Sequence, residues 1–323
     1  MNNFDTSRIS CSHINGRKYI IINPSKNQFE GNSINFDNLP LVSFCIPTKN
    51  NEDTLENCLK SIKMQNYPRK EIIVIDGYSS DLTITISERY ADKILYDAGT
   101  YGSACQTGLE ASSGEIIASI DSDIIIPHKN WLINAVQFFN YHQKVSSVWP
   151  LYEAPPHASS FARLYQTHLY KIFIESRIKR SISYFGGGNT LFLKKVLIEI
   201  GGIDRSIHWG ADFDWAKKMK DKGYMVVLID DPLYHDTMRT LRQFYRKQFL
   251  GANTFTTTGF GLMGLTIKDV FYEHFILGFK GMIQGLLIHR DISWIYYPFL
   301  LFARLYAYLI TTMLKFFQRH EVI

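Results

Sequence analysis

Two aspartates one residue apart, Asp121 and Asp123, follow the apolar run 115–120 and are the residues best suited to chemistry. That run is rich in β-branched residues and lies between Gly114 and Pro127, which predicts a strand that carries both acids at its carboxyl end. Residues i and i+2 of an extended chain point to the same side. The two carboxylates therefore suit one Mg²⁺ or Mn²⁺ ion, since both ions prefer oxygen ligands. A solvated turn at a strand end is the alternative interpretation of so short a pattern.

The chain around this pair alternates short apolar runs with helical patterns, which predicts an α/β fold with a largely parallel sheet. The expected strands are 41–47, 71–76, 93–96 and 115–120, and the expected helices are 53–65, 81–90 and 103–112. Further along, the pattern predicts a long amphipathic helix over 158–178, a helix that begins near Asp212 and a strand over 224–229. Since the carboxyl ends of parallel strands share one edge of a sheet, polar residues after different strands are expected to meet there.

Composition limits the classes of function. The 323 residues are 46% hydrophobic and carry a formal charge of +5, without a long basic run or an RNA-binding signature. Nucleic acid is therefore not an expected partner, whereas phosphate-bearing ligands or an anionic membrane surface are compatible with the charge. The four cysteines show no C-x-x-C and no zinc spacing, which favours a reducing, cytosolic compartment. The first residues also lack the pattern of a signal peptide.

The segment 268–318 is apolar and aromatic, and its length would cover a bilayer, which takes about 20 helical residues. Arg304 interrupts it, and a central arginine costs about 2.5–3.5 kcal/mol on the insertion scale. Aromatic residues such as Trp294 and Tyr297 favour the headgroup region. We expect two helices that lie on the cytoplasmic face of the cell membrane. A spanning helix, or helices that pack onto the rest of the protein or a partner chain, are the alternatives.

Four segments carry further polar residues at the ends of expected elements. The first is Val42-Ser-Phe-Cys-Ile-Pro-Thr-Lys-Asn-Asn, and the second is Glu71-Ile-Ile-Val-Ile-Asp-Gly. The third leads into the aspartate pair. The fourth is Gly187-Gly-Asn-Thr-Leu-Phe-Leu, followed by Gly210-Ala-Asp-Phe-Asp-Trp-Ala.

In this order the four segments resemble the family 2 glycosyltransferases, inverting nucleotide-sugar enzymes of the GT-A fold, over about residues 41–260. The resemblance implies a Rossmann-like mixed sheet flanked by helices, in a catalytic domain with donor (41–150) and acceptor (151–260) halves. Composition adds a polar extension before this domain (1–40) and apolar membrane-associated helices after it (261–323). The resemblance also implies a nucleotide-sugar donor, a Mg²⁺ or Mn²⁺ cofactor, and a glycan or lipid-linked acceptor.

The resemblance assigns residues as well. It implies that the nucleobase and ribose contact Pro47, Thr48 and Asp76, and that the ribose and the metal-bound diphosphate contact Asp121 and Asp123. It implies that the donor sugar and acceptor are bordered by Gly187, Gly188 and Asn189, and that the general base is Asp212. Asp214 is the competing base and otherwise a contact of the acceptor pocket. The helix dipole would keep Asp212 ionised, although a plain N-cap is its alternative role.

Some residues depart from the family pattern. Ala211 stands where an acid usually precedes the base, and Ile75-Asp-Gly-Tyr replaces two consecutive acids, so the donor nucleotide stays open. His235 is a candidate ligand of the metal or the diphosphate, or a structural histidine. Arg239, Arg242 and Arg246 are spaced for one helix face that would bind a donor or lipid phosphate, unless they form a solvated stripe.

The function that these residues favour is metal-dependent inverting glycosyl transfer at the cytosolic membrane surface. An enzyme that glycosylates a polyprenyl or dolichyl phosphate is the first alternative, because that acceptor is already an anion and needs no base. A sugar-nucleotide nucleotidyltransferase is more remote, since the turn after the first strand, 46–50, is not a Gly-rich phosphate loop. A binding protein without activity is the third alternative.

Overall fold

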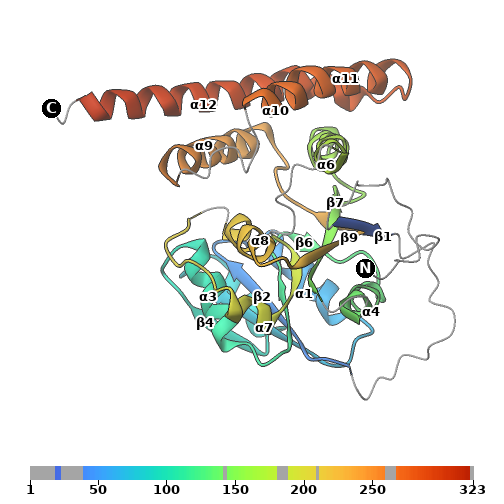
Figure 1. The fold of residues 1–323 in the computed structure, drawn as a ribbon, viewed down its shortest axis with the longest axis vertical. Helices are drawn as coiled ribbons and strands as arrows, with labels where there is room; N and C mark the ends of the chain where they lie inside the picture. Colours follow the sequence, from blue (N-terminus) through green and yellow to red (C-terminus); the bar gives the residue numbers. More distant parts are fainter. Residues whose placement is uncertain are drawn as a thin grey trace. The chain divides into compact units, whose positions relative to one another are not determined.

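The computed structural model describes residues 19–22, 39–140, 144–179, 188–208, 211–258 and 267–320. They belong to two compact units, each built from two segments of the chain. Unit 1 comprises Met1–Leu151 and Tyr184–His235, and unit 2 comprises Tyr152–Ser183 and Asp236–Ile323. Figure 1 shows that unit 1 contains the sheet and that unit 2 is largely helical. The predicted boundaries at residues 40, 150 and 260 stay predictions.

Unit 1 is built on a nine-stranded sheet in the order β1-β9-β7-β8-β5-β2-β3-β4, with β6 paired to β9. The strands are β1 (Tyr19–Ile22), β2 (Val42–Thr48), β3 (Lys70–Asp76), β4 (Lys93–Tyr96), β5 (Ile116–Ser119), β6 (Ile124–Ile125), β7 (Val145–Glu153), β8 (Thr190–Leu193) and β9 (Met225–His235). Strands β5, β2, β3 and β4 are parallel, which confirms the predicted alternating core. Strand β8 runs antiparallel to β5 and β7, so the sheet is mixed.

Helices cover both faces of this sheet (Figure 1). They are α1 (Leu55–Lys63), α2 (Thr83–Glu88), α3 (Tyr101–Ala111), α4 (Trp131–Gln137), the short 3₁₀ helix Phe138–Asn140, α7 (Lys194–Glu199) and α8 (Ala211–Asp221). Alternate strand residues such as Cys45, Ile73 and Ile117 pack with α3, α7 and α8 in one apolar cluster. Because alternate strand residues point to opposite faces, their neighbours form a second core layer on the other side of the sheet.

Strand β9 differs from its prediction in a way that matters for the site. The sequence pattern predicts a strand over 224–229, because the acids and proline at 230–232 are typical of a turn. The strand instead continues to His235, and its last residues pair antiparallel with β6: Ile124 lies opposite His235 and Ile125 opposite Tyr234. Strand β6 follows directly on the aspartate pair, so this extension brings a distant histidine beside it.

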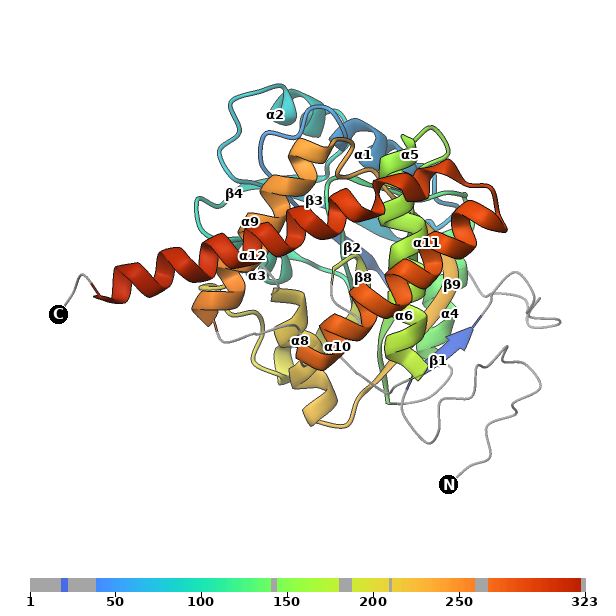
Figure 2. The ribbon, with the colours of Figure 1, turned by 90° about the horizontal axis from the view of Figure 1, so that it is seen from above.

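Unit 2 consists of helices from both of its segments. The first segment gives α5 (Ser160–Arg163), the π-helical turn η4 (Leu164–Leu169) and α6 (Tyr170–Lys179). The second gives α9 (Leu241–Thr258), α10 (Ile267–Phe271), η6 (Tyr272–Leu277), α11 (Gly278–Leu287), η7 (Ile292–Tyr296) and α12 (Tyr297–His320). Seen from above, α11 and α12 diverge from the turn that joins them, and α9 crosses close to α12 (Figure 2). The predicted helix over 158–178 is confirmed as the continuous run α5-η4-α6.

A glycine stripe on α11 holds η7 and α12 in place. A Cβ at Gly278 would lie 1.7 Å from the Tyr297 hydroxyl, and one at Gly285 would lie 2.0 Å from Trp294. These two aromatic side chains are only 1% and 4% exposed and belong to the core of unit 2, where the Tyr297 hydroxyl donates to the backbone carbonyl of His274. The expectation that Trp294 and Tyr297 lie at the lipid headgroups is therefore wrong, because glycine leaves room for both rings between the helices.

Candidate active site

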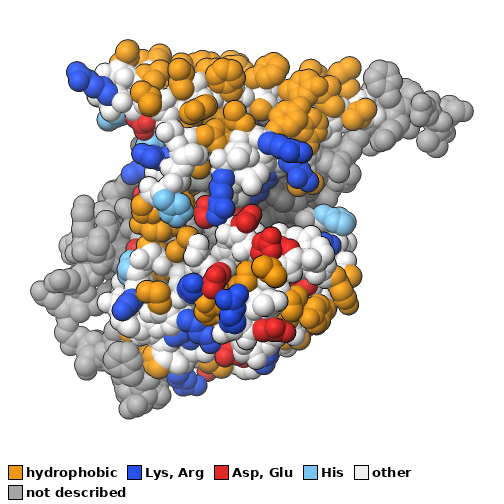
Figure 3. Space-filling model, turned by 180° about the vertical axis from the view of Figure 1, so that it is seen from behind, with side chains coloured by type: hydrophobic (Ala, Val, Ile, Leu, Met, Phe, Trp, Pro, Cys, Tyr) orange, Lys and Arg blue, Asp and Glu red, His pale blue; other side chains and the backbone are white. Residues whose placement is uncertain are grey.

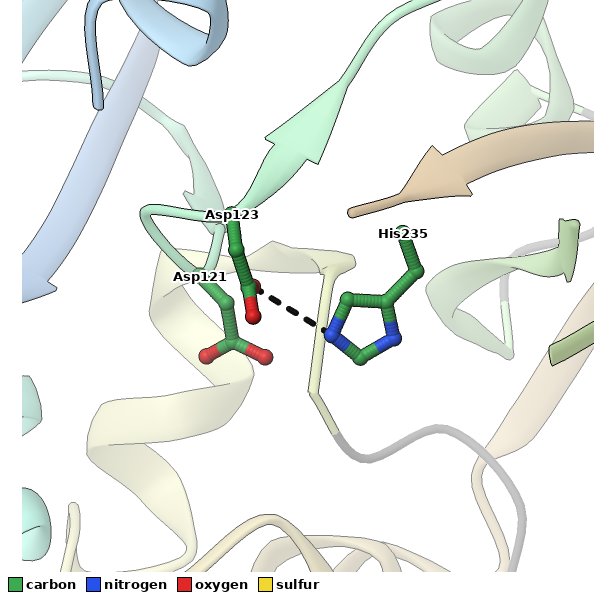
Figure 4. Close-up of side chains that lie close together, drawn as sticks. All are labelled: Asp121, Asp123 and His235. Carbon is green, nitrogen blue, oxygen red and sulfur yellow. Dashed lines mark ion pairs between the residues drawn. The ribbon is translucent and has the colours of Figure 1, made fainter. Parts of the chain in front are cut away.

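Two carboxylates and one imidazole converge after β5 and at the end of β9 in unit 1. The nearest ligand atoms of Asp121, Asp123 and His235 all lie within 4.8 Å of one another (Figure 4). The Asp123 carboxylate (Oδ1) lies 3.2 Å from Nε2 of His235, and both side chains are largely buried. A carboxylate–carboxylate–imidazole set of this size could hold one divalent ion. The prediction that these three residues meet is thus realised in the geometry, although their ligand role stays a prediction.

Asp121 is held by hydrogen bonds to both carboxylate oxygens. The Tyr101 hydroxyl donates to one oxygen over 2.9 Å, and the Asn189 side-chain amide donates to the other over 3.0 Å. The backbone N–H of Asp121 in turn donates to the Asn189 side-chain oxygen over 2.6 Å. Asn189 is 2% exposed and has a φ of 60°, a conformation in which asparagine is enriched. This reciprocal pair, together with Tyr101, fixes the orientation of Asp121.

Sequence reasoning placed Asn189 beside the sugar and missed Tyr101. Strands β5 and β8 pair so that Ser119 faces Thr190, and this register brings residue 189 next to the turn that begins at Ile120. Tyr101 starts α3 after the Thr100 cap, with no sequence signal beyond that cap. The contact of Asn189 with sugar or acceptor stays a prediction, while its amide is committed to Asp121.

The turn between the two aspartates is anchored to the segment after β2. The Asn51 side chain donates to the Ser122 hydroxyl, and the Thr54 hydroxyl donates to the Ser122 carbonyl over 3.2 Å. The Cys58 thiol lies 3.7 Å from the carbonyl oxygen of Asp121. Burial, followed by the nearby Asp123 and Asp121 charges, raises the pKa of the Cys58 thiol. Cys58 is therefore a protonated packing residue rather than a nucleophile or a metal ligand.

The expected donor residues lie at the same sheet edge. Strand β2 is hydrogen-bonded between β5 and β3, and its last residue, Thr48, is paired with Asp76 of β3. Asp76 is fully buried, and its two oxygens accept hydrogen bonds from the Ser79 backbone N–H (2.8 Å) and hydroxyl (2.5 Å). Pro47, Thr48 and Asp76 therefore lie at the carboxyl ends of strands neighbouring β5, the strand that leads into the aspartate pair. The contacts of these three residues with nucleobase and ribose stay predictions. In the structure, the Asp76 carboxylate stabilises the turn over residues 77–79.

Two exposed tyrosines, Tyr78 and Tyr96, were not among the sequence candidates. Their ring centroids are 5.5 Å apart, and both side chains are more than half exposed. Tyr78 follows β3 with a φ of 59°, and Tyr96 ends β4. The sequence signal that could have identified them is an aromatic residue at or shortly after the end of a strand, because large aromatic side chains are unusual on a solvated edge. They are a platform on which a planar ring could stack.

The predicted helix near Asp212 is confirmed as α8, which begins at Ala211. The side chain of Asp212 lies outside the described part of the chain, and so does Gly187; Gly188 is described and half-buried next to Asn189. The Asp214 carboxylate forms an ion pair of 2.5 Å with Lys218, one turn later on α8. Two residues along a helix correspond to about 200° around its axis, so positions 212 and 214 lie on different sides of α8.

The three expected phosphate-binding arginines divide into two kinds within unit 2. Arg239 precedes α9 and makes a two-point ion pair with the buried Asp236, with N–O distances of 2.9 and 2.6 Å. Arg242 and Arg246 lie one turn apart on α9 and are exposed. The shared helix face that the spacing predicts therefore holds for Arg242 and Arg246. Their binding of phosphate, and that of His235, stays a prediction.

Comparison with known proteins supplies an independent view. A family model described as glycosyl transferase family 2 matches residues 43–201. The glycosyltransferase AglE of Haloferax volcanii is 30% identical over 224 residues, which cover 65% of this chain and 71% of that protein. An uncharacterised glycosyltransferase of Rickettsia typhi is 29% identical over 197 residues, which cover 56% of this chain and 59% of that protein.

Among solved structures, the mannosyltransferase PcManGT from Pyrobaculum calidifontis, in complex with GDP-Man and Mn²⁺, is similar to this fold. The TM-score is 0.55 at 18% sequence identity, and the match covers 84% of this chain and 87% of that chain. At 18% sequence identity, this similarity shows that the two proteins share a fold. It agrees with the mixed sheet and flanking helices described above.

Proposed function

From the finding that this chain belongs to glycosyltransferase family 2, we propose that it transfers a sugar, with inversion, from a nucleotide-diphospho-sugar to a hydroxyl group. The proposed acceptor is a lipid-linked or nascent glycan at the cytoplasmic face of the membrane. The observation that carries the proposal is the cluster of Asp121, Asp123 and His235 at the carboxyl edge of the sheet. Open α/β sheets bind their ligands at this edge.

The donor set fits a divalent metal ion. Carboxylate oxygens suit Mg²⁺ and Mn²⁺ alike, whereas an imidazole nitrogen is a poor ligand for Mg²⁺ and a better one for transition metals. We therefore propose Mn²⁺ as the preferred cofactor, held by Asp123 and His235 with Asp121. PcManGT, of the same fold, was solved with Mn²⁺ and GDP-Man. When bound, such an ion neutralises the charge that forms on the leaving diphosphate.

The chain's own residues would then organise the transfer. The acceptor oxygen forms a bond to the anomeric carbon while the bond from that carbon to the diphosphate oxygen breaks, and the electron pair of that bond leaves with the nucleoside diphosphate. The acceptor proton needs a base on the opposite face, and we propose Asp212. Asp214 is less suited to this role, because Lys218 already pairs with its carboxylate. Asp121, fixed by Asn189 and Tyr101, would hold the ribose or the metal-bound end of the donor.

A second candidate acceptor is a polyprenyl phosphate. It is favoured by Arg242 and Arg246, two exposed guanidinium groups one helical turn apart, a spacing at which both can contact one phosphate. In that case the acceptor is already an anion, and transfer needs no base. Replacement of Asp212 by asparagine separates the two, since it should lower transfer to a hydroxyl by about a hundredfold or more and spare transfer to a phosphate.

Calorimetric titration with UDP-, GDP- and dTDP-sugars, with and without Mn²⁺, tests the proposal. We expect one nucleotide class to bind with clear dependence on Mn²⁺, and the dependence to disappear in Asp123→Ala. A matched control is Glu88→Gln, an exposed acid at the end of α2. Lack of metal-dependent binding for every donor would contradict the proposal. A donor screen with linkage analysis of the product then identifies the sugar and the acceptor.

A further inference from the structure

The exposed side of unit 2 is apolar over a long continuous surface. On α11, η7 and α12 most of the large exposed side chains are hydrophobic, and Figure 3 shows them as a band. We call this surface the outer apolar face. It comprises Ile283, Leu287, Ile288, Ile292, Ile295, Phe299, Phe302, Leu305, Leu309, Met313 and Leu314. A contiguous apolar surface of this kind on a folded domain marks a contact with a membrane or another protein.

The opposite side of α12 faces the protein and carries the polar group. The buried residues of this side are Tyr297, Leu300, Ala307 and Thr311, and with Arg304 between Leu300 and Ala307 they recur every three or four positions. Arg304 lies on the same side: its guanidinium donates to the Gln248 side chain of α9 and contacts His274 of η6, each over 2.8 Å. The arginine that interrupts the apolar sequence thus points away from the outer apolar face. That face itself carries no charge within the described residues.

The exposed charged side chains around the outer apolar face are positive. Between residues 268 and 314 of the described chain they are Lys268, Lys280 and Arg290, with His289 also exposed. The acids of this stretch are less exposed: Asp269 is half-buried, Glu273 is fully buried against Arg177 at a closest distance of 2.8 Å, and the half-buried Asp291 pairs with His168 over 2.8 Å. A cationic border around an apolar surface is complementary to anionic lipids, where each cation contributes about 1 kcal/mol.

Helix α12 by itself would also be long enough to cross a membrane. The window Ile292–Leu314 qualifies by length and hydropathy, with 28% of it buried inside the protein. The packing of α9 along α12 argues against a crossing. Tyr306 of α12 contacts Tyr245 and Phe249 of α9, in addition to the Arg304–Gln248 bond. A spanning α12 would draw α9 into the hydrocarbon layer with Arg242 and Arg246, at about 2.5–3.5 kcal/mol for each.

We propose that unit 2 docks into a single leaflet of an anionic bilayer through the outer apolar face, with α12 lying parallel to the membrane surface. In this orientation Arg304 stays inside the protein, and α9 lies on the aqueous side of α12, with Arg242 and Arg246 within reach of lipid phosphates. This proposal rests on the proposed function, because it specifies how unit 2 would contact the membrane. The experiments below measure membrane binding and not glycosyl transfer, so either proposal can fail while the other holds.

Flotation of the full chain with vesicles tests the docking face. Binding should be stronger with phosphatidylcholine–phosphatidylglycerol vesicles than with phosphatidylcholine alone. Phe302→Glu should lower the partition coefficient by about tenfold or more, because a charge then enters the apolar layer. The matched control is Ile198→Glu, since Ile198 is exposed to a similar degree on α7 of unit 1 and should leave partition unchanged. If Phe302→Glu leaves partition unchanged but dissociates a dimer in solution, a second copy of the chain covers this face and the proposal is wrong.

Depth measurements decide the orientation. Single cysteines at Phe299, Leu309 and Met313 would carry a fluorophore in a Cys11→Ser background, because Cys45, Cys58 and Cys105 are buried. Quenchers at different depths in the bilayer should place all three labels at the same shallow depth. A spanning helix would separate the first and last labels by about 21 Å, at 1.5 Å for each residue. A depth difference of that size would overturn the proposal, even with a folded and fully bound protein.

Discussion

The two units distribute polar and apolar side chains in opposite ways. Unit 1 buries aliphatic strand residues such as Ile73 and Ile117 and presents carboxylates at the edge of its sheet. Unit 2 buries Glu273 and His274 under its helices and exposes phenylalanine and leucine. Since the free energy of burial favours apolar groups away from water, this difference is the observation on which the membrane docking proposed for unit 2 rests.

Unit 2 retains its buried polar groups because they satisfy one another. The Arg177 guanidinium donates to both oxygens of Glu273, and Arg304 reaches Gln248 and His274. Removal of one partner from such a pair is costly, because it leaves the other group buried without compensation. The polar interior therefore fixes the way in which the helices pack, while the apolar exterior is the surface for which we propose membrane docking. In unit 1 the register of the strands fixes which residues lie next to one another.

The largest expected effect is on the Asp123 site, and it tests whether catalysis depends on unit 1 while vesicle binding depends on unit 2. Asp123→Ala should lower kcat/KM by about a thousandfold or more and abolish Mn²⁺ binding, because it removes a charged ligand from the site. Vesicle partition and thermal stability should stay within the range of the Glu88→Gln control. An active Asp123→Ala protein, or one that also loses vesicle binding, would break the proposed separation of roles.

Asp212→Asn should lower transfer to a hydroxyl acceptor by about a hundredfold or more, since a general base contributes about 10²–10⁴. Asp214→Asn is the matched control on the same helix and should cost less than tenfold. Donor binding, measured by calorimetry, should be unchanged in both. Equal losses in the two variants would mean that α8 contributes through its structure rather than through one base.

A smaller effect is expected when the hydrogen bonds from Asn189 and Tyr101 to Asp121 are removed. Asn189→Gly keeps the positive φ but removes the amide, so Mn²⁺ affinity should fall by about 10- to 100-fold, the usual range for groups that orient a ligand. Tyr101→Phe removes one hydrogen bond and should have the weaker effect. Mn²⁺ titration followed by electron paramagnetic resonance measures both without turnover. Unchanged affinity in Asn189→Gly would show that Asp121 needs no orientation.

The glycine stripe gives a stability test for unit 2. Alanine normally stabilises a helix interior by about 1 kcal/mol relative to glycine. Gly285→Ala should instead destabilise by about 1–3 kcal/mol, because the added methyl overlaps Trp294 and forces the helices apart. Gln284→Ala, at the neighbouring exposed position, is the control. Denaturant unfolding measures the difference, and a stabilised Gly285→Ala protein would contradict the packing.

The last expected effect is close to zero at neutral pH and appears only as the pH falls. Burial, followed by the positive charges of Arg304 and Arg177, lowers the pKa of His274 to about 2. Below about pH 6.5 the unfolded chain binds a proton that the folded chain does not, so the free energy of unfolding falls as the pH falls. His274→Gln should make this loss shallower between about pH 6.5 and 4. Parallel pH profiles for the two proteins would show that His274 does not contribute.

Some of this architecture was readable from local sequence. The runs that became β2, β3, β4 and β5 are short, apolar and β-branched, and their periodicity shows in the residues themselves. The acids at 121 and 123 follow directly on such a run. The four-residue β8 and the end of β9 were not predicted. Glycines precede β8, and two acids and a proline interrupt the apolar pattern of β9, so neither segment has the sequence pattern of a strand.

The sequence by itself thus determined an alternating α/β sheet, a carboxylate pair at a strand end and an apolar tail. Only the tertiary structure decided that His235 lies beside Asp123, that Asn189 and Tyr101 hold Asp121, and that Arg304 faces inward. The physical reason is the same in each case. Strand register and helix packing join residues that are far apart in the chain, and these long-range pairings leave no local pattern in the sequence.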